Sequence, residues 1–352
     1  MNLKHQPMQA MPGWLNHSLM AVLFSVLVVW LLGITSAVQA AQAANTANSA
    51  SAMAGAVTGT SAGNRGADYW RQVTRGESGY STHRHDEAGV LINRSGEDWR
   101  LLRNDTIKTY GAWALGVTLV GLVLVYLLFG ANKLDSPRSG RTVERWKRVD
   151  RYLHWTVAGL FIVLTITGLS ILYGRHFLPE LMGKGAFGSY MSLGKLLHNY
   201  LGVLFAILLV IMLVKWLANN LPTITDIQWF LQGGGMIKGK HPHAGYMNGG
   251  EKLWFWVLFL GGVVLMLSGL VLDFPAYFDN RDDFQLANLF HAVSALVLIC
   301  GATAHAYIGS VGTEGALEGM TTGQVDETWA KQHHDLWYEQ IKTDASEDKA
   351  ND

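Results

Sequence analysis

Residues 286–308 read LANLFHAVSALVLICGATAHAYI, and this stretch decides the fold. It is mostly apolar and slightly longer than the roughly 20 residues that a helix needs to cross a bilayer. It nevertheless carries two histidines, His291 and His305. Imidazole inside a bilayer is costly and usually marks a functional site. The stretch therefore predicts a membrane-spanning helix with two functional side chains.

The spacing of the two histidines places them on one face of that helix. They are 14 positions apart, which in an α-helix is a rise of about 21 Å and a rotation about 40° short of four full turns. The hydrocarbon core of a bilayer is about 30 Å thick. We therefore expect one imidazole near each side of the membrane.

Four further apolar stretches are long enough to cross a bilayer, namely residues 110–129, 152–173, 197–217 and 253–271. A soluble protein with five such core helices would need many more polar amphipathic segments to cover them. The sequence thus predicts an all-α integral membrane protein. We expect a four-helix transmembrane bundle, one extra N-terminal transmembrane helix and a signal peptide.

The composition excludes several classes of protein. The 352 residues include 27 basic and 27 acidic side chains, and only 15% of residues are charged. This balance argues against nucleic-acid binding, which depends on excess Lys and Arg. The single cysteine, Cys300, rules out an intrachain disulfide, a cysteine-based zinc site and an iron–sulfur cluster held by this chain alone. No CxxCH motif for covalent haem attachment occurs.

The N-terminal region is predicted to be exported. Residues 1–40 are typical of a secretory signal peptide, with a short apolar run and small residues at Val38 and Ala40. A retained anchor is the alternative. Residues 41–66 are almost entirely small and polar and predict a flexible linker. Residues 67–108 form an arm whose aromatics favour docking on a partner over a small surface domain or a disordered arm.

The rest of the chain divides at the apolar stretches. We expect an extra helix at 109–130, a basic loop at 131–151, the four-helix domain at 152–309 and a tail at 310–352. Lys and Arg are enriched in cytoplasmic loops, so the basic loop and, by alternation, the tail are predicted to be cytoplasmic. The acidic loop 273–288 and the loop 174–195 are then outside, the latter despite its three basic residues.

This orientation pairs the four membrane histidines. His154 begins its helix on the inner side, and His198 begins its helix on the outer side. His198 therefore meets His291 outside, and His154 meets His305 inside. Two such pairs, one above the other in a four-helix bundle, predict two b-type haems with their irons held by neutral imidazoles.

An iron with two axial histidines has no open position and serves one-electron transfer. We therefore expect no catalytic residue on this chain. A zinc or copper transport site is the metal alternative, but it would gather histidines and carboxylates at one depth. Glycines near the histidines are expected to make room for the macrocycles or to let the helices pack closely. These glycines are Gly168, Gly202, Gly269 and Gly301. The histidines outside the spans are read as surface residues, among them His241, His243, His333 and His334.

The chain resembles the cytochrome b (gamma) subunit of bacterial membrane-bound respiratory formate dehydrogenases. The resemblance covers about residues 145–340. It is carried by VDRYLHWT (149–156), KLLHNYLG (195–202), YMNGGEKLWFW (246–256), LFH (289–291), HAY (305–307), the WAKQHH that ends at His334, and Trp337-Tyr338. The signal, arm and extra helix depart from the shortest four-helix members and resemble a longer variant.

The resemblance implies a place in a complex of the bacterial inner membrane. Formate is oxidised outside by a molybdenum or tungsten alpha subunit, and electrons pass through an iron–sulfur beta subunit to the outer haem, the inner haem and a quinone (menaquinone or ubiquinone). Formate chemistry itself is not on this chain. The family's quinone pocket lies beside the inner haem, and its Asn falls on Asn248. Tyr246, Lys252 and the second ring nitrogen of His305 are the other candidates.

Two alternatives remain open from the sequence. A cytochrome b subunit of a membrane-bound nickel–iron hydrogenase, or of a thiosulfate-type reductase, has the same arrangement of paired histidines. A haem-free membrane anchor for a periplasmic enzyme is the third possibility, although such an anchor has no need of four histidines in two layers.

Overall fold

The computed structural model describes residues 79–80, 90–92, 94–235, 241–278 and 280–351. The predicted signal peptide, the linker and most of the arm lie outside these residues. The chain divides into two units, Met1–Asp98 and Trp99–Asp352. The described part of the first unit holds an antiparallel pair of short strands, β1 (Gly79–Tyr80) and β2 (Val90–Ile92), followed by the start of α4 (Arg94–Leu101).

Five helices of the described chain are long and apolar enough to cross a membrane. The first runs through α4, a π-helical stretch η1 (Leu102–Ile107) and α5 (Lys108–Phe129). The others are α6 (Arg148–Tyr173), α8 (Lys184–Trp216), α10 (Gly249–Asp273) and α11 (Arg281–Ile308). All five predicted spans are thus found as helices, and the protein is an all-α, multi-pass membrane protein.

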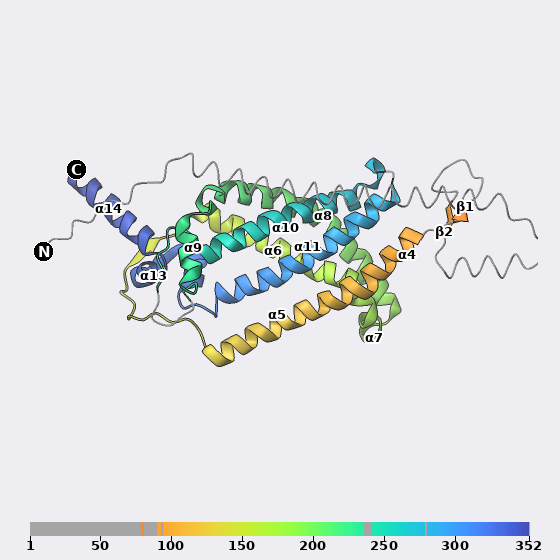
Figure 1. Cartoon of the computed structure of the whole chain (residues 1–352), viewed down its shortest axis with the longest axis horizontal. Helices are drawn as coiled ribbons and strands as arrows, with labels where there is room; N and C mark the ends of the chain where they lie inside the picture. Colours follow the sequence, from red (N-terminus) through yellow and green to blue (C-terminus); the bar gives the residue numbers. More distant parts are fainter. Residues whose placement is uncertain (1–78, 81–89, 93, 236–240, 279, 352) are drawn as a thin grey trace, which may run out of the picture. The chain divides into compact units, whose positions relative to one another are not determined.

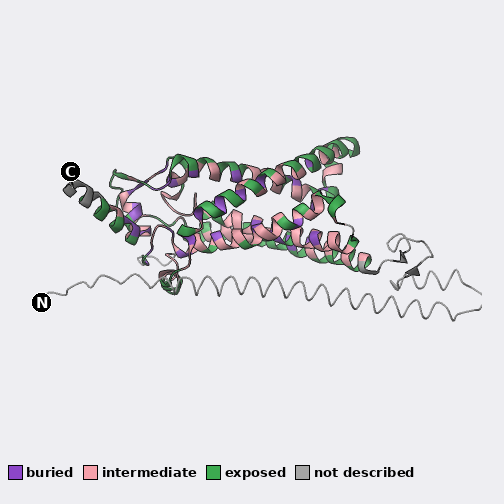
Figure 2. Ribbon diagram, turned by 90° about the horizontal axis from the view of Figure 1, so that it is seen from above, coloured by how far each residue is buried: buried purple, intermediate pink, exposed green. Residues whose placement is uncertain are grey.

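Four of these helices form a bundle built from two pairs (Figure 1). Helix α6 packs against α8, α10 packs against α11, and α8 against α10 joins the pairs. The core lies between α6, α8 and α10, where Phe205, Leu209 and Phe255 are buried. Much of the remaining helix surface is exposed and apolar (Figure 2), as expected where lipid rather than water is the solvent.

Helix α5 packs on the outside of this bundle against α11. The hydroxyl of Tyr173 donates to the Lys108 carbonyl at 2.9 Å, and Lys108 Nζ donates to His176 Nε2 at 3.1 Å. Gly111 allows the close approach, because a Cβ there would lie 2.5 Å from Leu296 Cδ1. The extra helix is therefore seated by specific contacts as well as by apolar surface.

The helices are longer than the apolar stretches that predict them. Helix α8 begins at Lys184 and α11 at Arg281, each more than one turn before the predicted start. The predicted outer loop 174–195 is consequently mostly helical, with η2 (Gly174–His176), α7 (Leu178–Met182) and the first turns of α8. Polar turns at a bilayer surface keep helical hydrogen bonds but carry no apolar signal, so hydropathy places the ends too far inward.

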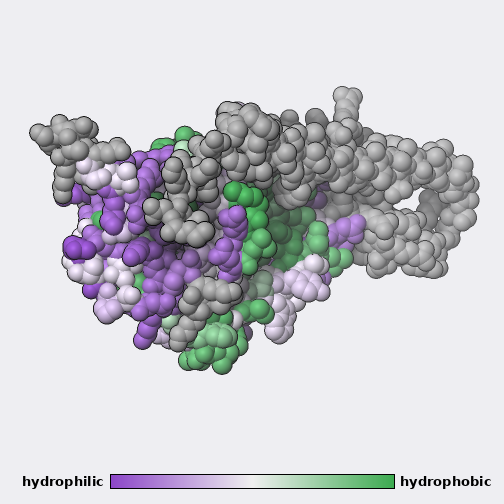
Figure 3. Space-filling model, turned by 60° about the vertical axis from the view of Figure 1, so that its left-hand side comes forward, coloured by the Kyte–Doolittle hydropathy of each residue, from purple (hydrophilic) through white to green (hydrophobic). Residues whose placement is uncertain are grey.

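The basic loop and the tail fold together, although the sequence treats them as separate segments. Strand β3 (Thr142–Glu144) pairs antiparallel with β4 (Gln324–Asp326), with Val143 opposite Val325. Helices α12 (Ala316–Thr321), α13 (Glu327–His333) and α14 (Asp335–Asn351) complete the tail. We call residues 130–147, 241–248 and 309–344 the polar cap. Figure 3 shows hydrophilic side chains gathered at this end and hydrophobic ones on the helices beside it.

Asp326 stabilises the turn from β4 into α13. Its carboxylate accepts hydrogen bonds from the backbone N–H groups of Ser139, Gly140 and Thr328. Burial alone would raise the pKa of this carboxyl, but these three donors outweigh it and the pKa is lowered. The cap is therefore held by a charged group that stays ionised at neutral pH.

Candidate functional site

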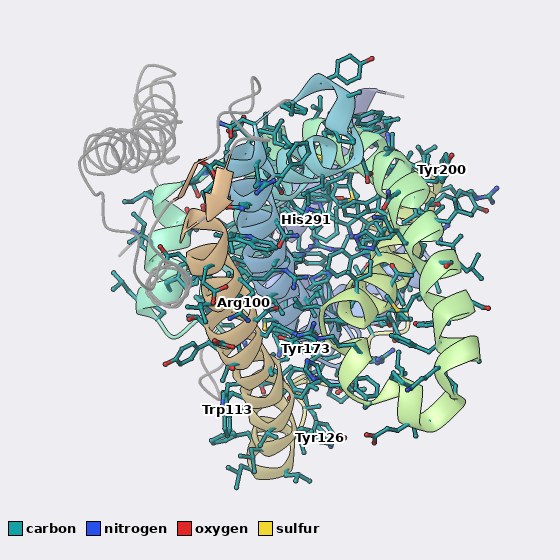
Figure 4. All side chains as sticks on the ribbon, turned by 90° about the vertical axis from the view of Figure 1, so that its right-hand side faces the viewer. Arg100, Trp113, Tyr126, Tyr173, Tyr200 and His291 are labelled. Atoms are coloured by element: carbon teal, nitrogen blue, oxygen red, sulfur yellow. The ribbon has the colours of Figure 1, made fainter. Side chains whose placement is uncertain are left out.

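The structure brings the four membrane histidines together in two pairs. His198 on α8 faces His291 on α11, with ring centres 6.1 Å apart. His154 on α6 faces His305 on α11, with ring centres 6.2 Å apart. These are the pairs that the spacing and the charge pattern predict. Figure 4 shows His291 pointing into the bundle, with Tyr200 on its outside.

Two hydroxyl groups hold the rings of the His198–His291 pair. Thr167 Oγ1 donates to the Val163 carbonyl at 2.9 Å, so its lone pair accepts from His198 Nδ1 at 2.8 Å. This bond requires the hydrogen of His198 to sit on Nδ1 and leaves Nε2 free for a metal. We call Thr167, Ser268, His198 and His291 the hydroxyl layer.

Ser268 lies beside His291, the other imidazole of this pair, as Thr167 lies beside His198. Its hydroxyl donates to the Val264 carbonyl at 2.6 Å. His291 Nδ1 lies 3.3 Å from Ser268 Oγ and 3.1 Å from the Leu265 carbonyl oxygen. A carbonyl can only accept, so His291 also carries its hydrogen on Nδ1 and presents a bare Nε2.

A glycine follows each of these hydroxyl residues and receives the imidazole. A Cβ at Gly168 would lie 3.1 Å from His198 Cε1, and one at Gly269 would lie 3.2 Å from His291 Cε1. The pair Thr167-Gly168 on α6 and the pair Ser268-Gly269 on α10 thus make equivalent contacts with the two imidazoles. The other glycines predicted to surround the cofactors behave differently, because Gly301 faces Trp254 and Gly202 has open space beside it.

The second pair is held by indole rings. Trp254 stacks on His305 with ring centres 5.3 Å apart and planes 16° apart, and Trp216 stacks on His154 at 6.4 Å and 26°. The Nδ1 atom of His154 is buried without a hydrogen-bond partner among the described residues. We call His154, His305, Trp216 and Trp254 the tryptophan layer.

The residues of both layers fit a metal held between two imidazoles. Bonds from a metal to an imidazole nitrogen are about 2 Å long, so two rings on opposite sides of one metal have centres about 6 Å apart. Both observed separations match this value. In the hydroxyl layer the tautomers also match, and the two glycines let each imidazole approach the neighbouring helix closely. A b-type haem is the group that this donor set suits best.

Asn248, Tyr246 and Lys252, which are predicted to bind a quinone, make hydrogen bonds or an ion pair with other residues of the chain. Asn248 caps α10: its Oδ1 accepts from the Glu251 N–H at 3.0 Å, while Glu251 Oε2 accepts from the Asn248 N–H at 2.9 Å. Tyr246 donates its hydroxyl hydrogen to the Arg145 carbonyl. Lys252 pairs with Asp226 at 2.9 Å. Of these side chains, the Asn248 amide Nδ2 makes no hydrogen bond with the described part of the chain.

Burial also fixes the state of Tyr246. It raises the pKa of this phenol to about 12, so the hydroxyl remains a protonated hydrogen-bond donor at neutral pH. Because that hydrogen is already given to Arg145, the geometry assigns Tyr246 to the stability of the polar cap.

Two expectations about the remaining histidines need correction. His334 is fully buried, and the Nε2 atom of His333 is inaccessible. The surface prediction was wrong for them because the tail folds back onto the loop, which residue type alone does not reveal. His241 and His243 do lie at the surface, where they contact Asp135 and Asp335.

Sequence reasoning also missed the groups that hold the imidazoles. Thr167 and Ser268 look like ordinary small polar residues of membrane helices, and Trp216 and Trp254 look like interface anchors. One signal was present: a hydroxyl residue followed by glycine occurs in two helices that each precede a histidine helix.

Comparison with known proteins agrees with this geometry. The pattern of the family described as prokaryotic cytochrome b561 matches residues 145–323. The chain belongs to this family, whose members are membrane proteins that carry haem b. Helix α5 lies before the matched region.

Several relatives bear more specific names. The cytochrome b556(Fdn) subunit of nitrate-inducible formate dehydrogenase from Escherichia coli (strain K12) is 30% identical over 208 residues, covering 57% of this chain and 93% of the relative. The formate dehydrogenase cytochrome b556 subunit of Haemophilus influenzae is 27% identical over 229 residues, covering 63% and 92%. The cytochrome b556(fdo) subunit of Escherichia coli (strain K12) is 28% identical over 206 residues, covering 57% and 94%.

Proposed function

We propose that this chain is the membrane cytochrome b subunit of a formate dehydrogenase and carries electrons through two b haems to a quinone. The observation that carries the proposal is the pair of facing imidazole layers, one above the other in the bundle. The names of the relatives support the choice of formate dehydrogenase. The partners are an iron–sulfur beta subunit and a molybdenum or tungsten alpha subunit.

The haem in each layer supplies reversible one-electron chemistry when bound. His198 and His291 would hold one iron, and His154 and His305 the other, through their Nε2 atoms. With an imidazole from each side, the iron would have no position left for dioxygen or a substrate. Thr167 and Ser268 keep the first pair in the required tautomer, a support that holds ligand rings in place in metal sites generally.

The proposed orientation of the two layers across the membrane follows from the loop charges. The basic loop and the tail, which together build most of the polar cap, are proposed to be cytoplasmic, as the positive-inside rule predicts. The hydroxyl layer then lies near the outer surface, where the partner subunits dock on this inner-membrane protein. The tryptophan layer lies beside the polar cap, where cytoplasmic protons are available for quinone reduction.

The quinone site is proposed beside the tryptophan layer. The amide Nδ2 of Asn248 would donate to a quinone carbonyl and stabilise the charge that develops there on reduction. The second ring nitrogen of His305 is the other proposed contact. Lys252 and Tyr246 are retained only as supports, because their polar atoms already have partners.

Two experiments test this function against its alternatives. A reduced-minus-oxidised spectrum of the purified chain should show two b-type haems, and a spectrum without haem bands would favour the membrane anchor. Co-purification should recover a molybdenum- or tungsten-containing formate dehydrogenase. Recovery of a nickel–iron hydrogenase or a thiosulfate-type reductase would replace formate as the source of electrons.

A further inference from the structure

Polar side chains gather around Glu251 at the junction of the polar cap and helix α10. The Glu251 side chain is 35% exposed, whereas its neighbours Arg145 and His334 are buried. Glu251 Oε1 accepts from Arg145 Nη2 at 3.0 Å, and Oε2 accepts from the Asn248 N–H at 2.9 Å. His334 Nε2 lies 3.9 Å from Oε2. The capping box of α10 explains the contact with Asn248. It explains neither the ion pair with Arg145 nor the proximity of His334.

His334 presents an unused proton acceptor to this carboxylate. Its side chain is fully buried, and its Nδ1 donates to the Gly245 carbonyl at 2.8 Å. The neutral ring therefore has a bare lone pair on Nε2, which has no hydrogen-bond partner among the described residues. Burial, with the charge of Arg145, holds the pKa of His334 well below its usual value, so the lone pair is free at neutral pH.

A second buried imidazole nitrogen belongs to the neighbouring residue His333. The Nε2 atom of His333 is also buried without a partner in the described chain. His333 interacts electrostatically with Glu251 and with His241, whose ring bonds the exposed Asp135 at 2.7 Å. Trp329 packs against both tail histidines, with ring centres 5.3 Å from His333 and 5.0 Å from His334.

Glu251 lies about one turn before Trp254 of the tryptophan layer on helix α10. Its charge acts on the ring of His305, and its capping partner is Asn248, the proposed quinone donor. Glu251 thus lies between the histidines of the tail and the place where the proposed function needs protons. The titratable and charged groups around it are Arg145, Tyr246, His305, His333 and His334.

We propose that a proton route leads from the polar cap to the quinone, and that Glu251 and His334 form the end of the route that is nearest to the quinone. The proposal rests on the quinone-reducing function above. A quinone takes two electrons from the cytochrome and two protons, one on each carbonyl oxygen, and becomes a quinol. For each proton, His334 Nε2 takes up a proton that arrives through His241 and His333 and passes it to the carboxylate oxygen Oε2 of Glu251, which then gives it to the quinone oxygen; both groups return to their starting state. A movement of about 1 Å brings Glu251 and His334 into hydrogen-bond distance.

The variant Glu251→Gln tests the route with little structural change. Glutamine preserves a capping box and can still accept from Arg145, but it cannot carry the proton. The complex, reduced beforehand with dithionite, is mixed with decylubiquinone or menadione in a stopped-flow instrument. We expect reoxidation to slow by about 100-fold or more, the contribution typical of general acid catalysis. His334→Gln should behave likewise.

The matched control is Glu318→Gln, which also removes a carboxylate paired with an arginine of the polar cap, here Arg138. It should reoxidise at the wild-type rate. A further readout needs no quinone: the midpoint potential of the tryptophan-layer haem should depend on pH in the wild type, because an added electron there favours protonated Glu251. Glu251→Gln should flatten that dependence and leave the hydroxyl-layer haem unchanged.

The outcomes separate the two proposals. Wild-type haems that neither quinone reoxidises would overturn the proposed function and the route with it. Normal quinone reoxidation in both Glu251→Gln and His334→Gln would overturn the route alone. A slower Glu251→Gln with an unaltered pH dependence of the potential would also overturn it, since the carboxyl would then act without binding a proton.

Discussion

The two imidazole layers have the same spacing but are held by different chemistry. In the hydroxyl layer, Thr167 and Ser268 accept hydrogen bonds from the rings, and a glycine seats each ring. In the tryptophan layer, indoles stack on the imidazoles and His154 Nδ1 has no partner among the described residues. A hydrogen bond at Nδ1 makes the imidazole a stronger donor to a metal. The hydroxyl layer is therefore expected to stabilise oxidised iron more strongly.

Under the proposed function, this difference would favour one direction of electron transfer. The haem with the more basic ligands would have the lower potential, so electrons entering at the hydroxyl layer would move downhill to the tryptophan layer. The same four helices carry both layers, and the expected difference arises from the side chains that surround the ligands.

Removing a ligand should separate the layers most clearly. His198→Ala or His291→Ala should eliminate the hydroxyl-layer haem and leave the other haem present, because either substitution removes one of the two imidazoles of that layer and neither touches His154 or His305. Haem content and a redox titration of the purified protein measure this. If His198→Ala and His154→Ala abolished the same haem, the pairing would be wrong.

Removing a hydroxyl should weaken only one layer. Thr167→Val keeps the shape of the side chain but leaves His198 Nδ1 without its acceptor. Haem affinity of the hydroxyl layer should fall about 10- to 100-fold, the usual cost of losing such a partner, and its potential should rise. Thr156→Val is the control, since Thr156 bonds only the Tyr152 carbonyl. Equal effects of the two variants would show that the hydroxyl of Thr167 has no special role.

Removing an indole should act on the opposite layer. Trp254→Leu deletes the ring stacked on His305, an interaction worth about 1 kcal/mol beyond the area it buries. The potential and the absorption band of the tryptophan-layer haem should shift, while the hydroxyl-layer haem keeps both. A redox titration followed at two wavelengths distinguishes the haems. A shift confined to the hydroxyl-layer haem would contradict the assignment.

The smallest effect concerns Asn248, which serves as a helix cap and as the proposed quinone donor. Serine caps a helix as well as asparagine does, whereas alanine costs about 1 kcal/mol. Asn248→Ser and Asn248→Ala should both slow haem reoxidation by quinone severalfold, with haem content unchanged, because both lack the amide. Reoxidation at the wild-type rate in Asn248→Ser would leave this residue as a cap alone.

The sequence predicts the number of helices and the pairing of the histidines well, because the membrane restricts the possible folds. Apolar length gives five helices, and the 14-residue spacing of His291 and His305, with the loop charges, gives the pairs that the structure shows. The ends of α8 and α11 and the helical loop 174–195 could not be predicted from hydropathy, since polar surface turns resemble loops. The burial of His334 and the support of His198 by Thr167 depend on contacts between distant segments, which a single sequence does not display.

The pairing of β3 with β4 also has a consequence for synthesis. Ser139 and its partner Asp326 are 187 residues apart. At about 5–20 residues per second, a ribosome needs about 10 to 40 s to make the intervening chain. During that time the arginine-rich segment before α6 lacks the carboxylates that later bind it. Because β4 follows α11 in the chain, the polar cap can close only after the last of the five membrane-spanning helices has been made.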